Sequence, residues 1–284
     1  MKRKHYFYNR EFSGFYGKIL SIFLILALII YLLPIVWMYI SSARTNADFI
    51  NAPLKIPSHL YFGNYVKAFK MAKIGYHFII SSIITTVSVF IIIAFSSLAA
   101  FSFSRLQYKG RDLLYSLFFL GLILPTQSFL VGMFVMFRVT HILNTLFSVI
   151  LPISAIGLPI AILLIKAFFD SLPSSLEESA LIEGANVIQI FWYISLPIAN
   201  AIIATVIVFN TINAWNEFML PFVMIQTERL KPLTTSLYVF STKHSAKLTL
   251  KLAALTIIAT PMFIVYFVFQ NQIQKGITAG AIKD

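Results

Sequence analysis

Cysteine is absent from the 284 residues, and charged residues are scarce. Without cysteine the chain has no disulfides, no thiolate metal ligands and no cysteine nucleophile. The histidines show no metal-ligand spacing; they are His5, His59, His77, His141 and His244. The sequence also lacks a phosphate-binding loop of the form G-x-x-x-x-G-K-[ST], which excludes ATP hydrolysis by that route.

Long apolar stretches take up most of the chain. Hydrophobic residues make up 59% and charged residues 11%, with a mean hydropathy of +0.85, whereas soluble domains carry about 25% charged residues. Uncharged windows run over 19–43, 74–104, 113–137, 139–165, 184–216 and 252–274. Each exceeds the roughly 18 residues that mark a candidate membrane span, and none alternates with the period of two that is typical of barrels. We therefore predict an all-α membrane protein with six transmembrane helices.

The predicted spans divide the chain into an arm, a first helix, a main domain and a tail. The arm is 1–18, the first helix 19–41, the domain 74–271 and the tail 272–284; the other spans are 78–103, 113–136, 144–168, 199–222 and 252–271. The basic arm resembles a signal peptide, but its apolar stretch is too long and no cleavage site follows, so we interpret it as an uncleaved span. Prolines 34, 125, 152, 159, 221 and 261 are expected to bend their helices.

Charge alone leaves the orientation nearly open. The net charge of +12 comes from basic residues in loops and flanks, where they suit lipid headgroups better than nucleic acid. The dense arm and the short connection 104–112 mildly favour termini on the inside. Two long connections, 42–77 and 223–251, either contact a soluble partner or simply link the spans.

The segment 169–197 differs from the rest of the chain. Asp170, Glu177, Glu178 and Glu183 give it four of the ten acidic residues. Ser174 with Glu177 has the spacing of a capping box, and acidic residues suit the first turn of a helix. Gly184 is expected to end this helix with a sharp bend, and a second short helix follows. We predict a helix–Gly–helix hairpin that projects from the membrane.

This hairpin carries a known motif. The pattern E-A-A-x3-G-x9-I-x-L-P is matched by Glu178, Ser179, Ala180, Gly184, Ile194, Leu196 and Pro197, with serine in place of one alanine. The chain therefore resembles the membrane subunits of bacterial ATP-binding-cassette (ABC) importers, with the fold of a type I importer permease. Further strings, among them 103–106, 143–145 and 215–218, resemble the second permease subunit of maltose-type carbohydrate importers.

The resemblance implies how the chain works and with which partners. The hairpin, including Glu177, would dock in a groove on a cytosolic ATPase, so that the hairpin and both termini lie in the cytoplasm. Two ATPase subunits, which bind ATP and Mg, would rock this permease against a second permease subunit. An extracellular or periplasmic solute-binding protein would deliver the sugar. The tail residues Gly276, Thr278, Gly280 and Lys283 would lie near the ATPase, and no cofactor is expected in this chain.

Polar residues on the fifth predicted span are candidates for the substrate path. Asn210, Asn213 and Glu217 fall at i, i+3 and i+7, on one helical face. Amides and a carboxylate bind sugar hydroxyls, and Trp215 is placed to stack on a sugar ring. Two alternatives stay open: Glu217 snorkels at the outer end of its span beside Trp215, or the asparagines bond neighbouring helices.

Other functions, among them an intramembrane enzyme and a stand-alone membrane channel, fit less well. A glycerol phosphate, polyol or modified-sugar cargo would keep the same superfamily, but an anionic cargo predicts cationic residues in the path, and Arg138 and Lys166 lie only at span edges. An intramembrane enzyme would need paired carboxylates, a serine–lysine dyad or clustered histidines. A self-contained transporter usually shows internal repeats. None of these features is evident, which leaves a non-catalytic importer subunit as the main hypothesis.

Overall fold

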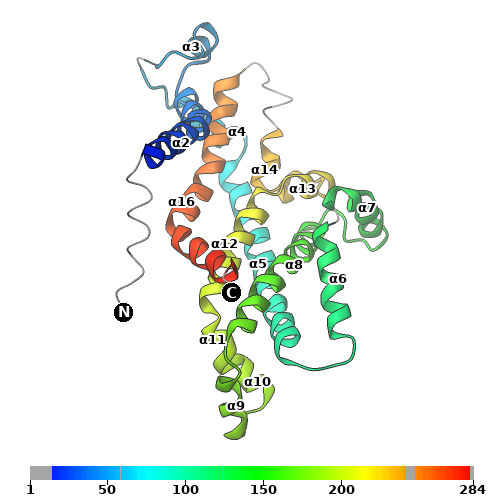
Figure 1. The fold of residues 1–284 in the computed structure, drawn as a ribbon. Coiled ribbons are helices and arrows are strands. Elements are labelled where there is room, and N and C mark those ends of the chain that lie inside the picture. Colours follow the sequence, from blue (N-terminus) through cyan, green and yellow to red (C-terminus); the bar gives the residue numbers. More distant parts are fainter. Residues whose placement is uncertain (1–14, 58, 124, 239, 241–246, 282–284) are drawn as a thin grey trace. The chain divides into compact units, whose positions relative to one another are not determined.

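The computed structural model describes residues 15–281 except 58, 124, 239 and 241–246, and for 271–281 it describes the backbone. Within this part every regular element is a helix, which confirms the all-α prediction (Figure 1). In chain order they are α2 (Phe15–Ser42), α3 (Asn46–Asn51), α4 (Gly63–Met71), α5 (Ile74–Arg105), α6 (Arg111–Ile123), η1 (Thr126–Phe129), α7 (Leu130–Val139), α8 (Phe147–Ser171), α9 (Ser175–Ile182), α10 (Val187–Ile190), η2 (Phe191–Ser195), α11 (Leu196–Ile198), α12 (Asn200–Asn216), α13 (Met219–Met224), η3 (Glu228–Leu230), α14 (Leu233–Ser236) and α16 (Leu248–Ala281).

Four described helices are long and apolar enough to cross a membrane: Gly17–Ser42 of α2, all of α5 and α8, and Leu248–Gln270 of α16. Two bent pairs reach that length only together. The segments Arg111–Ile123 and Thr126–Val139 meet at 97°, and Val187–Ile198 and Asn200–Asn216 meet at 73°. The described chain therefore has four continuous spans, or up to six if each bent pair counts as one. The number six stays a prediction.

The predicted spans 113–136 and 199–222 are each interrupted. α6 ends at Ile123, and Pro125, which has no N–H to donate, takes an extended conformation before η1. α12 ends at Asn216, Glu217 is extended, and α13 starts at Met219. By contrast, prolines 34, 152, 159 and 261 lie inside uninterrupted helices.

The chain divides into two compact units, residues 1–71 with 240–257 and residues 72–239 with 258–284. In the first unit, the connection after α2 is held by buried polar groups. The Arg44 guanidinium donates to the carbonyls of Asp48, Ala52 and Pro53 at 2.8 to 3.0 Å. Asn64 Nδ2 donates to the carbonyls of Ser42 and Arg44 at 2.9 and 2.7 Å. The first part of the connection 42–77 is therefore an ordered segment held by side-chain hydrogen bonds, rather than a simple link between spans.

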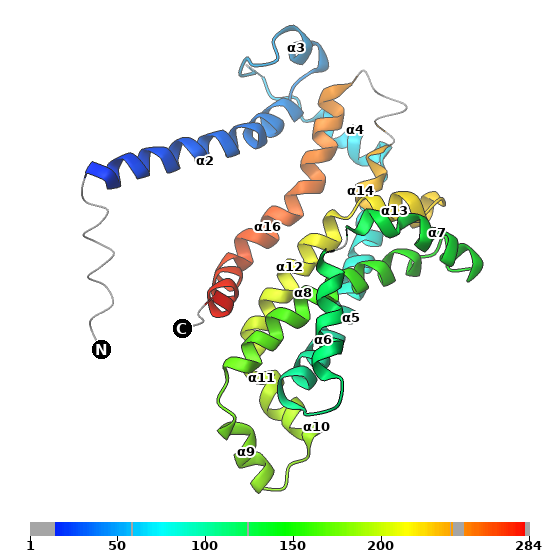
Figure 2. The ribbon, with the colours of Figure 1, turned by 45° about the vertical axis from the view of Figure 1, so that its right-hand side comes forward.

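The second unit is built on the pair α5 and α8, which lie side by side along most of their length (Figures 1 and 2). Small residues let the two backbones approach, as is common between membrane helices. Ser88 Oγ lies 3.4 Å from the Ile150 carbonyl, and Ser154 Oγ donates to the same carbonyl at 2.7 Å. α12 packs on both helices. These three helices position the groups described below.

Replacing Ser154 with leucine should force α5 and α8 apart, because Ser154 is buried at their contact. We expect a loss of about 1–3 kcal/mol in stability, the range for overpacking. Ala155→Leu is the matched control, because Ala155 is exposed on the same helix; its effect should stay within about 0.5 kcal/mol. Thermal unfolding of the detergent-purified protein measures both. Equal melting temperatures for the two variants would contradict the close α5–α8 contact.

Candidate functional site

The hairpin 169–197 extends beyond the ends of α5 and α8 (Figure 2). α9 stops where Gly184 takes a φ of +89°, a conformation that favours glycine. The N–H of Ala185 donates to the Ala180 carbonyl and the N–H of Gly184 to the Leu181 carbonyl, at 2.9 and 3.0 Å. These two backbone hydrogen bonds are the pair that defines a Schellman motif at the end of a helix. The predicted bend at Gly184 is therefore present.

Among the described residues, no side chain or backbone from elsewhere in the chain packs closely against Gly184. A Cβ built on Gly184 would meet no atom within 4 Å. The glycine is needed for its backbone conformation, and the space around it is open for another molecule.

The predicted capping box at Ser174 is wrong. Ser174 makes no side-chain cap hydrogen bond, and its own backbone is already helical, with a φ of −63° and a ψ of −22°. The Glu177 carboxylate points toward Arg105. Arg105 Nε lies 2.7 Å from Glu177 Oε2. A capping box forms instead at the second helix of the hairpin, where Asn186 and Gln189 bond each other's backbone N–H at 2.8 and 2.9 Å.

The predicted coupling residues separate into an inner and an outer group. Ala180 is buried against Phe169, Ile190 and Phe191, with Ile194 and Leu196 packed beside this cluster. Glu177 is also turned inward. The outer residues are exposed; they are Glu178, Ser179, Gly184 and Pro197. The inner group fixes the shape of the hairpin, and the outer group is free to meet a partner.

Large apolar side chains are exposed around the tip of the hairpin. Ile182 is 87% exposed, Tyr193 79% and Ile188 70%. The hairpin is predicted to lie outside the membrane, where so much exposed apolar surface is typical of an interaction site.

The predicted tail residues cannot be assigned contacts. Gly276, Thr278 and Gly280 lie on the last turns of α16, where only the backbone is described, and Lys283 lies outside the described residues. Their place near an ATPase stays a prediction.

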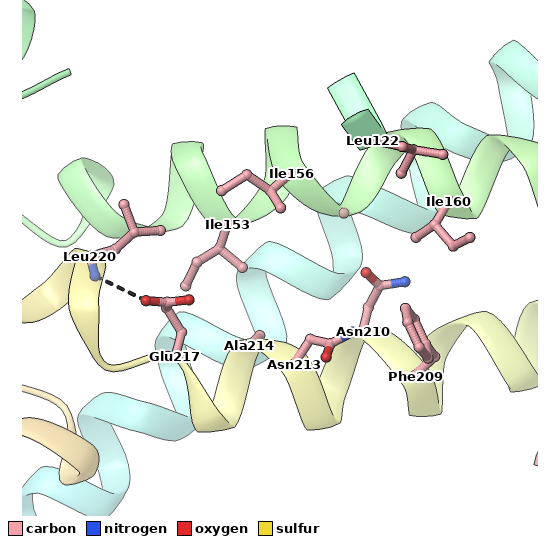
Figure 3. Close-up of a pocket in the computed structure, with 11 residues that line it drawn as sticks. Leu122, Ile153, Ile156, Ile160, Phe209, Asn210, Asn213, Ala214, Glu217 and Leu220 are labelled. Carbon is pink, nitrogen blue, oxygen red and sulfur yellow. Dashed lines mark hydrogen bonds between the residues drawn. The ribbon is translucent and has the colours of Figure 1, made fainter. Parts of the chain in front are cut away.

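A partly open cavity of about 440 Å³ lies between α8 and α12, with one further lining residue each from α6 and α13 (Figure 3). It is lined by Leu122, Ile153, Ile156, Gly157, Ile160, Phe209, Asn210, Asn213, Ala214, Glu217 and Leu220. The three polar residues predicted to share one face of the helix all lie on this wall. None of the eleven lining residues is lysine, arginine or histidine.

The polar groups of the cavity are held in place by local bonds. Glu217 Oε1 accepts from the N–H of Leu220 at 2.9 Å, which caps the start of α13 and places the carboxylate at the cavity wall (Figure 3). Asn210 is buried and donates to the Val206 carbonyl at 2.9 Å. Asn213 is exposed, so its amide is free to bond a guest molecule.

Sequence reasoning missed Gly157, which makes the close approach at this cavity possible. A Cβ there would stand 2.5 Å from Ile92 Cδ1 on α5 and 2.6 Å from Asn210 Oδ1 on α12. A larger residue would have to displace these two buried side chains.

Trp215 does not line this cavity. Its ring is buried edge-on to Phe78, with centroids 5.2 Å apart. The suggestion that Trp215 stacks on a sugar finds no support in this arrangement. Its neighbour Asn216 lines a second, more open cavity of about 410 Å³ beside α16, with Ile212, Ala259, Met262, Phe263 and Tyr266.

Asn144 joins the ends of α7 and α13, a role that sequence reasoning did not assign. Its φ is +63°, and its Oδ1 accepts from the N–H groups of Gln226 and Thr227 at 2.9 Å each. Nδ2 donates to Thr227 Oγ1 at 2.8 Å. One asparagine therefore fixes the connection that follows α13 against the turn before α8.

Residues 92–279 match the model of a family described as the inner membrane component of binding-protein-dependent transport systems. The matched stretch is two thirds of the chain and includes the hairpin and all eleven lining residues of the cavity. The chain belongs to this family. The family predicted from the hairpin motif is thereby confirmed.

Relatives in this family cover nearly the whole chain. The diacetylchitobiose uptake system permease protein NgcG of Streptomyces coelicolor is 30% identical over 92% of this chain and 87% of its own length. The trehalose/maltose transport system permease protein MalG of Thermococcus litoralis is 32% identical over 91% of this chain and 94% of its own. Both are permease proteins of transport systems.

A solved structure shares the fold. A chain of a bacterial ABC transporter involved in the import of the acidic polysaccharide alginate superposes with a TM-score of 0.77 at 21% identity, over 90% of this chain and 95% of that chain. At this identity the match confirms the permease fold for our chain and leaves its cargo open.

Substitution of Gly184 should loosen the end of α9. A β-branched valine is strained at a φ of +89°, at a cost of roughly 1–2 kcal/mol, whereas asparagine tolerates positive φ better. We expect faster amide hydrogen exchange in residues 180–186 for Gly184→Val than for Gly184→Asn, with both proteins retained in the membrane. Identical exchange in the two variants would mean that the bend does not depend on residue 184.

Proposed function

We propose that this chain is a permease subunit of an ABC importer that carries a carbohydrate across the cytoplasmic membrane by alternating access. Family membership and the two sugar-transport relatives support this proposal. The chain itself would be non-catalytic: ATP and Mg would be bound by two copies of a separate ATPase subunit. A second permease and an external solute-binding protein would complete the complex.

The observation that carries the proposal is the hairpin 169–197. It is rigid on its inner side, through Ala180 and the aromatic cluster, and it exposes Ile182, Ile188 and Tyr193 on its outer side. A groove on a cytosolic ATPase would bury these side chains and move the hairpin with it. The hairpin, both termini and the tail would then lie in the cytoplasm.

The cavity between α8 and α12 supports a neutral sugar as cargo. The names of relatives do not decide the charge of the cargo, because they include both neutral disaccharides and an acidic polysaccharide. The cavity wall offers two amides and one carboxylate without a cation. A carboxylate repels an anionic sugar and accepts hydrogen bonds from hydroxyl groups, so the wall favours neutral or cationic sugars. The partner permease would supply the opposite wall.

Ile182→Asp should detach the ATPase. The side chain is exposed and supports no packing within the chain, so the permease should accumulate normally, while a charge in an apolar contact should lower the recovery of ATPase at least tenfold, as for a central interface residue. Co-purification in mild detergent, with the neighbouring genes expressed, measures this. Tyr108→Asp is the control, an exposed aromatic on the α5–α6 connection outside the hairpin. Equal recovery of ATPase in both variants would contradict docking at the tip.

Glu217→Gln should weaken uptake of a neutral sugar without disturbing the fold. Glutamine keeps an oxygen for the Leu220 N–H but loses the charge, and a hydrogen bond to a charged group contributes about 1.5–3 kcal/mol. We expect the KM to rise about tenfold or more, while Asn216→Ala, which lines the second cavity and not this one, leaves it unchanged. If the KM stays at its wild-type value, Glu217 serves only as the cap of α13.

A further inference from the structure

Arg105, the last residue of α5, joins that helix to the hairpin. Its Nε lies 2.7 Å from Glu177 Oε2 and 2.9 Å from Glu177 Oε1, and its Nη2 donates to the Leu172 carbonyl at 3.1 Å. The two side chains are only 15% and 14% exposed. This is an enclosed ion pair with fixed geometry, unlike a solvated contact between long side chains.

The same carboxylate also holds the far arm of the hairpin. Ser195 Oγ, on η2, donates to Glu177 Oε1 at 3.2 Å, and Ser195 is fully buried. Glu177 therefore ties three segments together: the end of α5, the first helix of the hairpin and its returning arm.

Aromatic packing reinforces this junction one turn further along α5. The Phe101 ring contacts Phe169 of α8 with centroids 6.0 Å apart, and Phe191 of the hairpin at 5.2 Å. Phe101 and Arg105 are four residues apart and share a face of α5. The apolar contact keeps the hairpin close, and the directional ion pair fixes its angle.

Two other ion pairs near this end of the unit do not bridge elements. Arg111 pairs with its neighbour Asp112, and Lys166 pairs with Asp170 one turn away on α8. The bridge from Arg105 to Glu177 is different in kind, because it joins residues 72 positions apart on separate helices.

From this junction α5 leads directly to the cavity. Ile92, on the same helix as Arg105, is buried at the point where Gly157 and Asn210 meet, since a Cβ on Gly157 would touch both Ile92 and Asn210. A displacement of α5 along or about its axis would therefore act at the cavity wall. Packed elements carry such displacements when they have two discrete arrangements.

We propose that Arg105 is a positioning residue for coupling: through Glu177 it transmits movement of the hairpin to α5, and through α5 to the cavity. This inference rests on the proposed function. It also changes the predicted role of Glu177, which holds the hairpin from inside, while Glu178, exposed beside it, remains on the outer side to meet the ATPase.

The test measures the movement of the cavity rather than sugar uptake. The chain has no cysteine, so Asn213→Cys places a single reactive thiol on the exposed part of the cavity wall. The complex is purified with its co-expressed subunits, and the rate of labelling by a polar maleimide is compared between the nucleotide-free state and the state trapped with ATP and vanadate. In the Asn213→Cys background we expect the rate to differ at least about fivefold between the two states.

Arg105→Gln and Glu177→Gln should abolish this difference while the ATPase still co-purifies, because the exposed tip of the hairpin is unchanged. Arg105→Lys should restore part of it, since lysine pairs with the carboxylate but lacks the separate Nε and Nη2 nitrogens by which arginine reaches Glu177 and the Leu172 carbonyl at once. Arg111→Gln is the matched control, and its labelling rate should differ between the two nucleotide states as much as that of the Asn213→Cys complex without further substitution.

Three outcomes overturn the inference. If both glutamine variants keep the full difference in labelling rate between the two nucleotide states, the ion pair is not needed to transmit the movement. If either loses the ATPase, the pair serves docking, and if neither accumulates in the membrane, it serves folding. A different result, in which the parent complex itself holds no ATPase or shows no nucleotide-dependent labelling, would contradict the proposed function instead.

Discussion

The hydrocarbon interior of a membrane leaves no water to bond a free backbone group, so each break in a spanning helix must be repaired by the protein itself. This constraint accounts for much of the local structure. Where α12 stops, the Glu217 carboxylate takes up the N–H of Leu220, and Thr234 Oγ1 donates to the Glu217 carbonyl at 2.9 Å. Where α6 stops, Pro125 has no N–H that needs a partner. At the first break, side chains replace the missing helical hydrogen bonds. At the second, proline has no N–H that would need one.

The same repair gives the cavity its chemistry. Glu217 follows the last residue of α12, and one of its carboxylate oxygens already accepts from the backbone N–H of Leu220. The asparagine next to Gly157 is similarly bonded to its own helix through Val206. Polar groups that complete the fold are thereby left with free positions toward the cavity. In this region the side chains that complete the fold also line the cavity.

The sequence predicted the features that depend on composition and short spacing. Uncharged windows gave the helical class and the approximate spans, the position of Gly184 gave the bend, and the i, i+3, i+7 spacing gave the shared face of Asn210, Asn213 and Glu217. The motif at Glu178 to Pro197 identified the family. Contacts between distant residues were beyond such reasoning. The capping-box spacing paired Glu177 with Ser174. In the structure the Glu177 carboxylate binds the Arg105 guanidinium instead, 72 positions away, because a hydrogen bond between two charged groups is stronger than one to a backbone amide.

The roles of Gly157 and Asn144 were also hidden, because each depends on which helix end or side chain lies opposite. A glycine in an apolar span gives no sign of what it touches, and an asparagine in a turn gives no sign of the loop it bonds. Only the packing of α5, α8 and α12 shows that Gly157 sits at the contact of all three. Spacing along the chain predicts faces of helices, and tertiary contacts decide what those faces meet.

The wall of the cavity has one part that is open to change and one that is not. Asn213 faces open space, and its replacement would alter the wall without moving a helix. Gly157 is enclosed by Ile92 and Asn210, so that a change there would displace buried side chains of α5 and α12. A scaffold divided in this way can acquire a new preference through a few exposed positions while its packed helices stay in place. This offers a physical route by which one architecture serves cargoes as different as disaccharides and polysaccharides.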